Sequence, residues 1–83
     1  MDTREILNSA VIKDTISRTS GYAHVRFECE LKDIPEVHEI HKKNPRAIAE
    51  HLDNYKWNFG GRDYSIRKLS NGRLRYSGII YID

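Results

Sequence analysis

The clearest alternation of apolar and polar residues lies between residues 22 and 32. The apolar positions are Val25, Phe27, Cys29 and Leu31, and charged residues stand between them. Because successive side chains of a strand point to opposite faces, this pattern predicts a strand with one buried face. The stretch Asp33-Ile34-Pro35 ends it.

The residues before this strand follow a helical pattern. Asp2 is a suitable helix cap, and Glu5 follows three residues later. Apolar residues then recur at helical spacing, so we predict a helix from about Thr3 to Lys13, with Ser17 as the farthest end. Several residues near its end are β-branched, so a strand is the alternative prediction for residues 10–17. A turn is expected at residues 18–21.

A second helix is predicted after Asn44-Pro45, where Asn caps the helix and Pro takes its first position. Apolar residues spaced by three and four extend this helix to about Trp57, and Gly60-Gly61 ends it. The conformation of residues 33–43 stays open, because their helical spacing covers only a short segment.

The last 22 residues predict a β-hairpin that turns at Asn71-Gly72, a dipeptide that tolerates the positive φ angles of a two-residue turn. Such a turn pairs Leu69 with Leu74 and Lys68 with Arg75. Gly78 interrupts the second strand, and a glycine inside a strand often marks a bulge that exchanges the faces beyond it.

Together these elements predict an α+β fold. We expect a small single domain, residues 1–83, with an antiparallel sheet of three or four strands and two main helices packed on one face. A domain of this size buries a modest fraction of its surface, so a homodimer is also expected.

Composition narrows the class of protein. No apolar run approaches the length of a membrane helix, and the N-terminus lacks a secretory signal pattern. Cys29 is the only cysteine, which excludes an internal disulfide and suits a reducing compartment. We therefore expect a cytoplasmic protein that does not associate with membranes.

Positive charge gathers in the predicted hairpin. The net charge of the chain is +2, yet residues 60–83 hold five basic and two acidic side chains. In the expected register, four cations share a face with tyrosines. Arginine and lysine neutralise phosphates, and tyrosine stacks on bases. The candidate contacts for RNA or single-stranded nucleic acid are Arg62, Tyr64, Lys68, Arg73, Arg75 and Tyr81. An ordinary solvated edge is the alternative.

Two other stretches are candidates for protein binding. Trp57 and Phe59 stand beside two glycines and fit either a core plug or an exposed contact point for a partner. An acidic series suits a basic partner or plain solvation: Glu28, Glu30, Asp33, Glu36 and Glu39.

No metal centre or cofactor is expected. Zinc usually needs three or four convergent ligands. The sequence has four histidines and a cysteine on an apolar strand face.

The segments Arg67-Leu69, Arg73-Tyr76 and Ile79-Asp83 resemble the last sheet strands of RelE/ParE-type toxins, some of which cleave ribosome-bound mRNA. The chain departs from that family by opening on a capped helix, and no catalytic role is carried over. Its composition is also similar to that of small accessory proteins of tailed phages, many of which bind a host protein or nucleic acid.

The sequence therefore predicts a small binding module without catalytic residues. RNA or single-stranded nucleic acid is the first expected partner. The alternative is a phage-type accessory protein that inhibits or regulates a host protein, and the third hypothesis is a RelE-like ribonuclease toxin.

Overall fold

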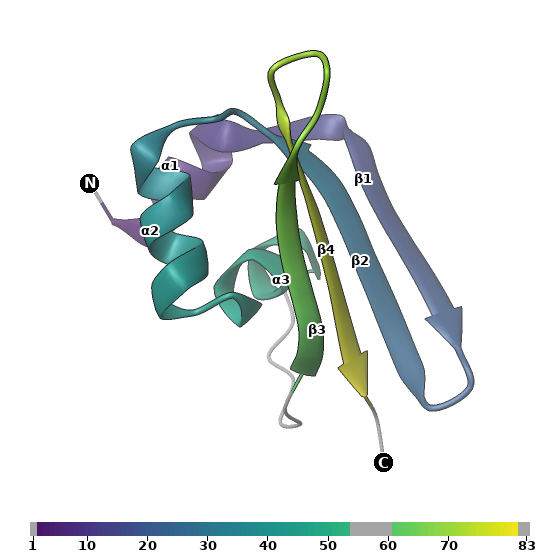
Figure 1. Cartoon of the computed structure of the whole chain (residues 1–83). Coiled ribbons are helices and arrows are strands. Elements are labelled where there is room, and N and C mark those ends of the chain that lie inside the picture. Colours follow the sequence, from purple (N-terminus) through teal and green to yellow (C-terminus); the bar gives the residue numbers. More distant parts are fainter. Residues whose placement is uncertain (1, 54–60, 82–83) are drawn as a thin grey trace.

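The computed structural model describes residues 2–53 and 61–81 (Figure 1). Their elements, in chain order, are α1 (Thr3–Ala10), β1 (Val11–Gly21), β2 (His24–Leu31), α2 (Pro35–Lys43), α3 (Arg46–Asp53), β3 (Gly61–Lys68) and β4 (Leu74–Tyr81). None of the described helices is long and apolar enough to cross a membrane.

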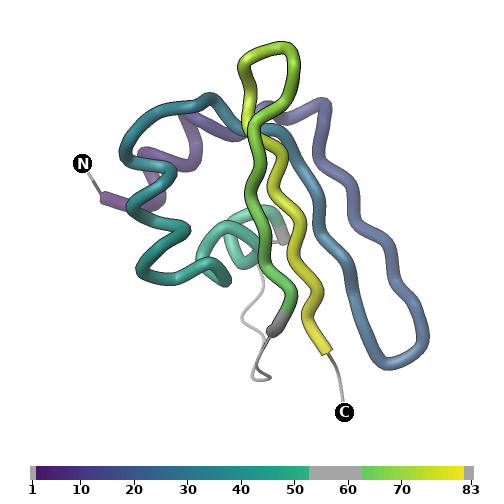
Figure 2. The backbone as a smooth tube through the Cα atoms, in the orientation of Figure 1, coloured from purple at the N-terminus to yellow at the C-terminus, as the bar shows by residue number. Residues whose placement is uncertain are grey.

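The four strands form one antiparallel sheet in the order β1-β2-β4-β3. The three described helices lie on one side of this sheet, and none of them covers the other side (Figures 1 and 2). The predicted α+β fold with a C-terminal hairpin is thus confirmed. The uncovered side of the sheet is called the open face below.

Helix α1 is shorter than its apolar pattern suggests. The Asp2 side chain accepts a hydrogen bond from the Glu5 backbone N–H at 2.9 Å, which caps the helix as expected. The helix stops at Ala10, and the chain continues directly into β1. The helix is therefore shorter than the predicted span to Lys13, and the strand alternative for residues 10–17 is the one that forms, from Val11 onward. The β-branched residues that follow Ala10 favour a strand, because their χ1 freedom is restricted in a helix.

The turn between β1 and β2 lies later than predicted. Residues 18–21 belong to β1, where Gly21 pairs with His24. Tyr22 and Ala23 make the turn instead, and Ala23 adopts a φ of 62°. A pairing partner across the sheet thus keeps a serine- and glycine-containing stretch extended, against its local preference for a turn.

Residues 33–43, for which the sequence predicts no single conformation, are mostly helical. Helix α2 begins at Pro35, which fits the first helical position because proline has no backbone N–H to satisfy there. Helix α3 begins one residue after Pro45. The predicted end of that helix, near Trp57, lies outside the described residues.

The β3-β4 hairpin is confirmed, but its predicted register was wrong by one residue. The Leu69 N–H donates to the Arg73 carbonyl at 2.8 Å, so three residues, including Asn71 and Gly72, form the loop. Among the residues of this loop, Gly72 is the one with a positive φ, of 86°. Asn71 instead accepts a hydrogen bond from the Arg73 N–H at 2.9 Å. This is the three-residue loop closed by a left-handed glycine.

The register change exchanges the faces of β3. Lys68 pairs with Leu74, and Ile66 pairs with Tyr76, whose side chain points toward the helices. Tyr64 and Ile66 consequently face the helices. The bulge that Gly78 suggested occurs in β3 instead, between Arg62 and Ser65.

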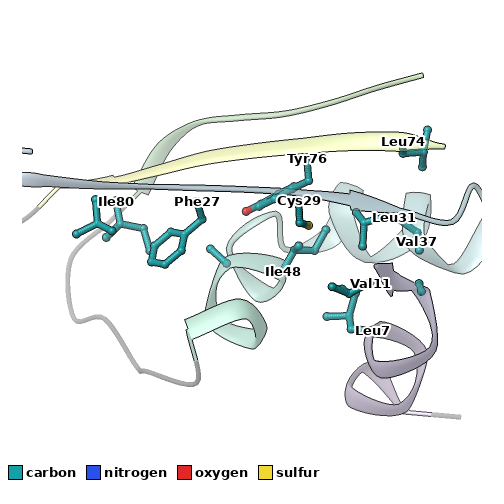
Figure 3. Packing of buried hydrophobic residues seen from close by; sticks show 13 residues of the cluster. Leu7, Val11, Phe27, Cys29, Leu31, Val37, Ile48, Leu74, Tyr76 and Ile80 are labelled. Carbon is teal, nitrogen blue, oxygen red and sulfur yellow. The ribbon is translucent and has the colours of Figure 1, made fainter. Parts of the chain in front are cut away.

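The hydrophobic core lies between the sheet and the helices. Phe27, Cys29 and Leu31 of β2 and Tyr76 and Ile80 of β4 are buried. Figure 3 shows these side chains on the helix side of the sheet, opposite residues such as Leu7, Val37 and Ile48. The alternation read from residues 25–31 is therefore confirmed.

Cys29 is expected to be chemically inert in the folded protein. Its exposed fraction is 0%, and burial raises its thiol pKa to about 12. Native protein at pH 8 should react with a disulfide reagent such as DTNB at least about a thousandfold more slowly than protein in urea, because labelling requires opening of the core. Immediate labelling of native protein would contradict this burial.

Candidate nucleic-acid interface on the open sheet face

The pairing register identifies the side chains on the open face. Their neighbours Val25, Phe27 and Ile80 point into the core, so the alternate positions of β2 and β4 point outward. The outward residues of these two strands are His24, Arg26, Glu28, Glu30, Arg75, Ser77, Ile79 and Tyr81. Ser65 and Arg67 join them from β3, because they pair with Ser77 and Arg75.

Two cations of this face stand apart from the ion pairs that the described residues form. Arg26 and Arg67 are both exposed. In the part of the chain that the structure describes, neither guanidinium has an ion-pair or hydrogen-bond partner. Arg26 lies opposite Ile79, and Arg67 lies opposite Arg75. An unpaired guanidinium presents all its donors to an incoming anion without first losing a carboxylate.

The two arginines that flank Leu74 are paired with carboxylates. Arg75 lies 2.9 Å from Glu28, and Arg73 lies 3.3 Å from Glu30. Both acidic partners come from β2, the strand beside β4. Ion pairs therefore neutralise Arg73 and Arg75, and Arg67, opposite Arg75, keeps a positive charge at the hairpin end of the open face.

Lys68 lies apart from these arginines. It points to the helix side of the sheet, and its ammonium lies 3.1 Å from a carboxylate oxygen of Asp33. The other oxygen of Asp33 lies 2.7 Å from the ring of His38. Hydrogen bonds from His38 and Lys68 lower the pKa of Asp33 below its ordinary value. This trio ties the hairpin to the start of α2.

The two tyrosines of the predicted site lie on different faces. Tyr64 is half-buried on the helix side, where its ring lies nearly parallel to that of Tyr76 with centroids 6.5 Å apart. Burial raises the pKa of Tyr64 above its ordinary value. Tyr81 is on the open face, 42% exposed, and its hydroxyl donates to Asp63 at 2.8 Å. The prediction of one face for both was wrong, because the hairpin register differs by one residue.

Arg62 pairs with Ile79 through its backbone, which places its position on the open face near Arg26. Of the six predicted nucleic-acid contacts, Arg75 and Tyr81 lie on the open face, beside the backbone position of Arg62. Arg73 follows the loop and pairs with Glu30, and Tyr64 and Lys68 lie on the helix side. Trp57 and Phe59 lie outside the described residues.

An aromatic end completes the open face. Tyr22 is 98% exposed in the β1-β2 turn, and His24 lies opposite Tyr81. The His24 Nδ1 lies 3.1 Å from the Tyr22 carbonyl oxygen, which steadies this turn. His24 and Arg26 therefore follow each other on the open face of β2, and Tyr22 stands in the turn just before them, at the end of the sheet opposite the hairpin loop.

Sequence reasoning missed this end of the face. The alternation in β2 already places Arg26 outward, but it does not tell which strand lies beside it. Net charge by segment directed attention to the hairpin. Glu28 and Glu30 of the same strand were a usable signal for the neighbouring strand. Two outward carboxylates in one strand favour a basic strand beside it, with which they form ion pairs.

The histidines do not converge on a metal site. His38 contacts Asp33, whereas His41 lies edge-on to Tyr76 with ring centroids 6.1 Å apart. Within residues 2–53 and 61–81 no group of three or more candidate ligands comes together.

Comparisons of the chain with protein-family models, with curated protein sequences and with solved structures find no match.

Proposed function

We propose that this protein is a binding module for RNA or single-stranded nucleic acid, and that the open face of the sheet is the binding surface. The observation that carries the proposal is that Arg26 and Arg67 have no partner among the described residues and lie on a sheet face that none of the described helices covers (Figure 1). We place this function in the cytoplasm, as the sequence suggests.

The spacing of the two arginines suits a flexible strand. Arg26 stands level with Ile79 and Arg67 level with Arg75. From strand geometry, they lie about 13 Å apart along the strands and about 10 Å apart across them. The small hydroxyl side chains of Ser65 and Ser77 lie between these levels. They leave room for a sugar-phosphate backbone that runs diagonally between the two guanidiniums.

The aromatic end supplies surfaces for bases. Tyr22 is almost fully exposed and Tyr81 partly so, with His24 between the turn and Arg26. Bases of a single strand stack on aromatic side chains, with about 1–3 kcal/mol per base. An uncovered sheet with aromatic and basic side chains is a known way to read unpaired bases. Duplex DNA offers no exposed base faces to such a surface.

The double variant Arg26→Ala/Arg67→Ala should bind a fluorescein-labelled single-stranded RNA about tenfold more weakly than the unchanged protein at low salt. Each lost phosphate contact should also reduce the log–log salt slope by about 0.7. Fluorescence anisotropy over a series of salt concentrations measures both quantities. Neither side chain has a partner among the described residues, so the fold should be kept.

A matched control removes the same charge elsewhere. Lys13 and Lys42 are exposed, on β1 and α2, and Lys13→Ala/Lys42→Ala should leave the affinity within about twofold. Equal weakening by both double variants would mean that only net charge matters, and would overturn the site. Absence of binding to RNA and to single-stranded DNA at low salt would overturn the function. Cleaved RNA on a gel would instead favour the toxin-like ribonuclease.

A further inference from the structure

A second surface lies on the helix side of the molecule. A groove of about 520 Å³ runs where α1 and α2 lie next to each other, and it reaches the start of α3. Ile6 of α1, Ile40 of α2 and Ala47 of α3 supply apolar side chains to it, and all three are half-buried. The volume falls in the range of sites that enclose apolar groups of a ligand.

Carboxylates surround this apolar floor. Asp2, Glu36 and Glu39 line the groove, and Lys43 is the one basic side chain among its described lining residues. Glu36 and Glu39 are one helical turn apart on α2 and exposed. Among the described residues neither carboxylate has an ion-pair or hydrogen-bond partner.

The acidic series of the sequence is thus divided by the fold. Each of three members has a basic partner: Arg75 for Glu28, Arg73 for Glu30 and Lys68 for Asp33. The other two members, Glu36 and Glu39, border the groove and have no partner among the described residues. Their charge is therefore free to act on something outside the domain.

We infer that this groove binds a basic amphipathic segment of a partner protein, with an apolar side chain on Ile6 and Ile40 and lysine or arginine beside Glu36 and Glu39. Apolar residues at helical spacing that enter a groove between helices are a recurring mode of peptide recognition. The carboxylates repel phosphates and anionic lipids, so nucleic acid is excluded from this groove by charge. The inference does not depend on the open face.

Ile6 offers a clean test of the apolar contact. Ile40 packs against the core, but Ile6 does not belong to that cluster. Ile6 is nevertheless half-buried and borders the groove. An Ile6→Gln replacement keeps a good helix former in α1 while it removes the apolar surface.

The probe is a fluorescein-labelled peptide of about 14 residues, four helical turns, with leucines on one face and lysines on the other. It should bind the unchanged protein, and Glu36→Gln/Glu39→Gln should weaken binding about fivefold. Ile6→Gln should weaken it about tenfold. In ¹⁵N-¹H spectra the peptide should shift amide signals of α1 and α2 and leave those of β2 and β4 in place.

Two controls separate the groove from general charge attraction. Asp14 is exposed on β1, away from the groove, so Asp14→Asn should change affinity less than the single variant Glu36→Gln. A peptide of the same composition in scrambled order, without an apolar face, should bind at least about fivefold more weakly than the amphipathic one.

Several results would overturn the inference. These are no binding of the amphipathic peptide, equal binding of the scrambled peptide, equal effects of Asp14→Asn and Glu36→Gln, or amide shifts confined to the sheet. The Glu36→Gln/Glu39→Gln variant should bind RNA with the affinity of the unchanged protein. Loss of peptide binding can then be separated from any loss of RNA binding at the open face.

Discussion

Replacing Tyr76 with alanine is expected to lower the free energy of unfolding by about 3–5 kcal/mol, the largest single effect in this domain. Tyr76 is completely buried. Its ring lies between Tyr64 and His41, and its hydroxyl donates to the Pro45 carbonyl at 2.8 Å. Because Pro45 precedes α3, this side chain connects the centre of the sheet to the junction of two helices. Urea denaturation followed by far-UV circular dichroism measures the loss.

A graded series separates the ring from the hydroxyl. Tyr76→Phe keeps the ring and leaves the Pro45 carbonyl without this donor, which should cost about 1–3 kcal/mol. The exposed Tyr22 provides the matched control, since Tyr22→Ala should change stability by less than about 0.5 kcal/mol. If Tyr76→Phe is as stable as the unchanged protein, the buried hydroxyl contributes nothing and this part of the interpretation is wrong.

Replacing Gly78 with alanine is expected to destabilise the protein by about 1–3 kcal/mol. A Cβ at this position would lie 2.7 Å from a ring carbon of Tyr64 and 2.8 Å from the Tyr76 hydroxyl oxygen. Strand propensity predicts the opposite sign, because glycine in a strand interior costs about 0.5–1 kcal/mol relative to alanine. The sign of the change in urea denaturation therefore distinguishes a packing requirement from a propensity effect.

A double-mutant cycle tests the cause of that loss. In a Tyr64→Ala background the nearest obstacle is removed, so the additional cost of Gly78→Ala should fall by about 1 kcal/mol or more. Additive effects of the two changes would show that Tyr64 and Gly78 do not interact, and would contradict the placement of Tyr64 on the helix side. Such a result would favour the register with Tyr64 outward.

Local patterns were sufficient where one strand face is buried along its whole length. The alternation over residues 25–31 predicted the inward face of β2, because a shift of one residue would expose every apolar side chain. The cap at Asp2 likewise depends on neighbours within a few residues, whereas Pro45, predicted at the first helical position, lies one residue before α3. These features, and the α+β class that they imply, follow from short-range chemistry.

Local patterns were insufficient where two conformations have similar intrinsic preference. The stretch from Val11 to Ser17 fits a short amphipathic helix or a strand, and pairing with β2 decides for the strand. The dipeptide Asn71-Gly72 fits loops of two or three residues. The side chain of Asn71 contacts both the Arg73 N–H and Glu30 of β2, and these contacts favour the longer loop.

The candidate sites show the same division. By itself the sequence determined that Arg26 points away from the core and that the hairpin is basic. Only the tertiary structure decided which charges remain unpaired, since Arg75 and Glu28 are 47 residues apart in the chain yet 2.9 Å apart in the sheet. Ion pairing depends on which strands become neighbours, and that order is set by burial of the whole apolar surface, which no local pattern contains.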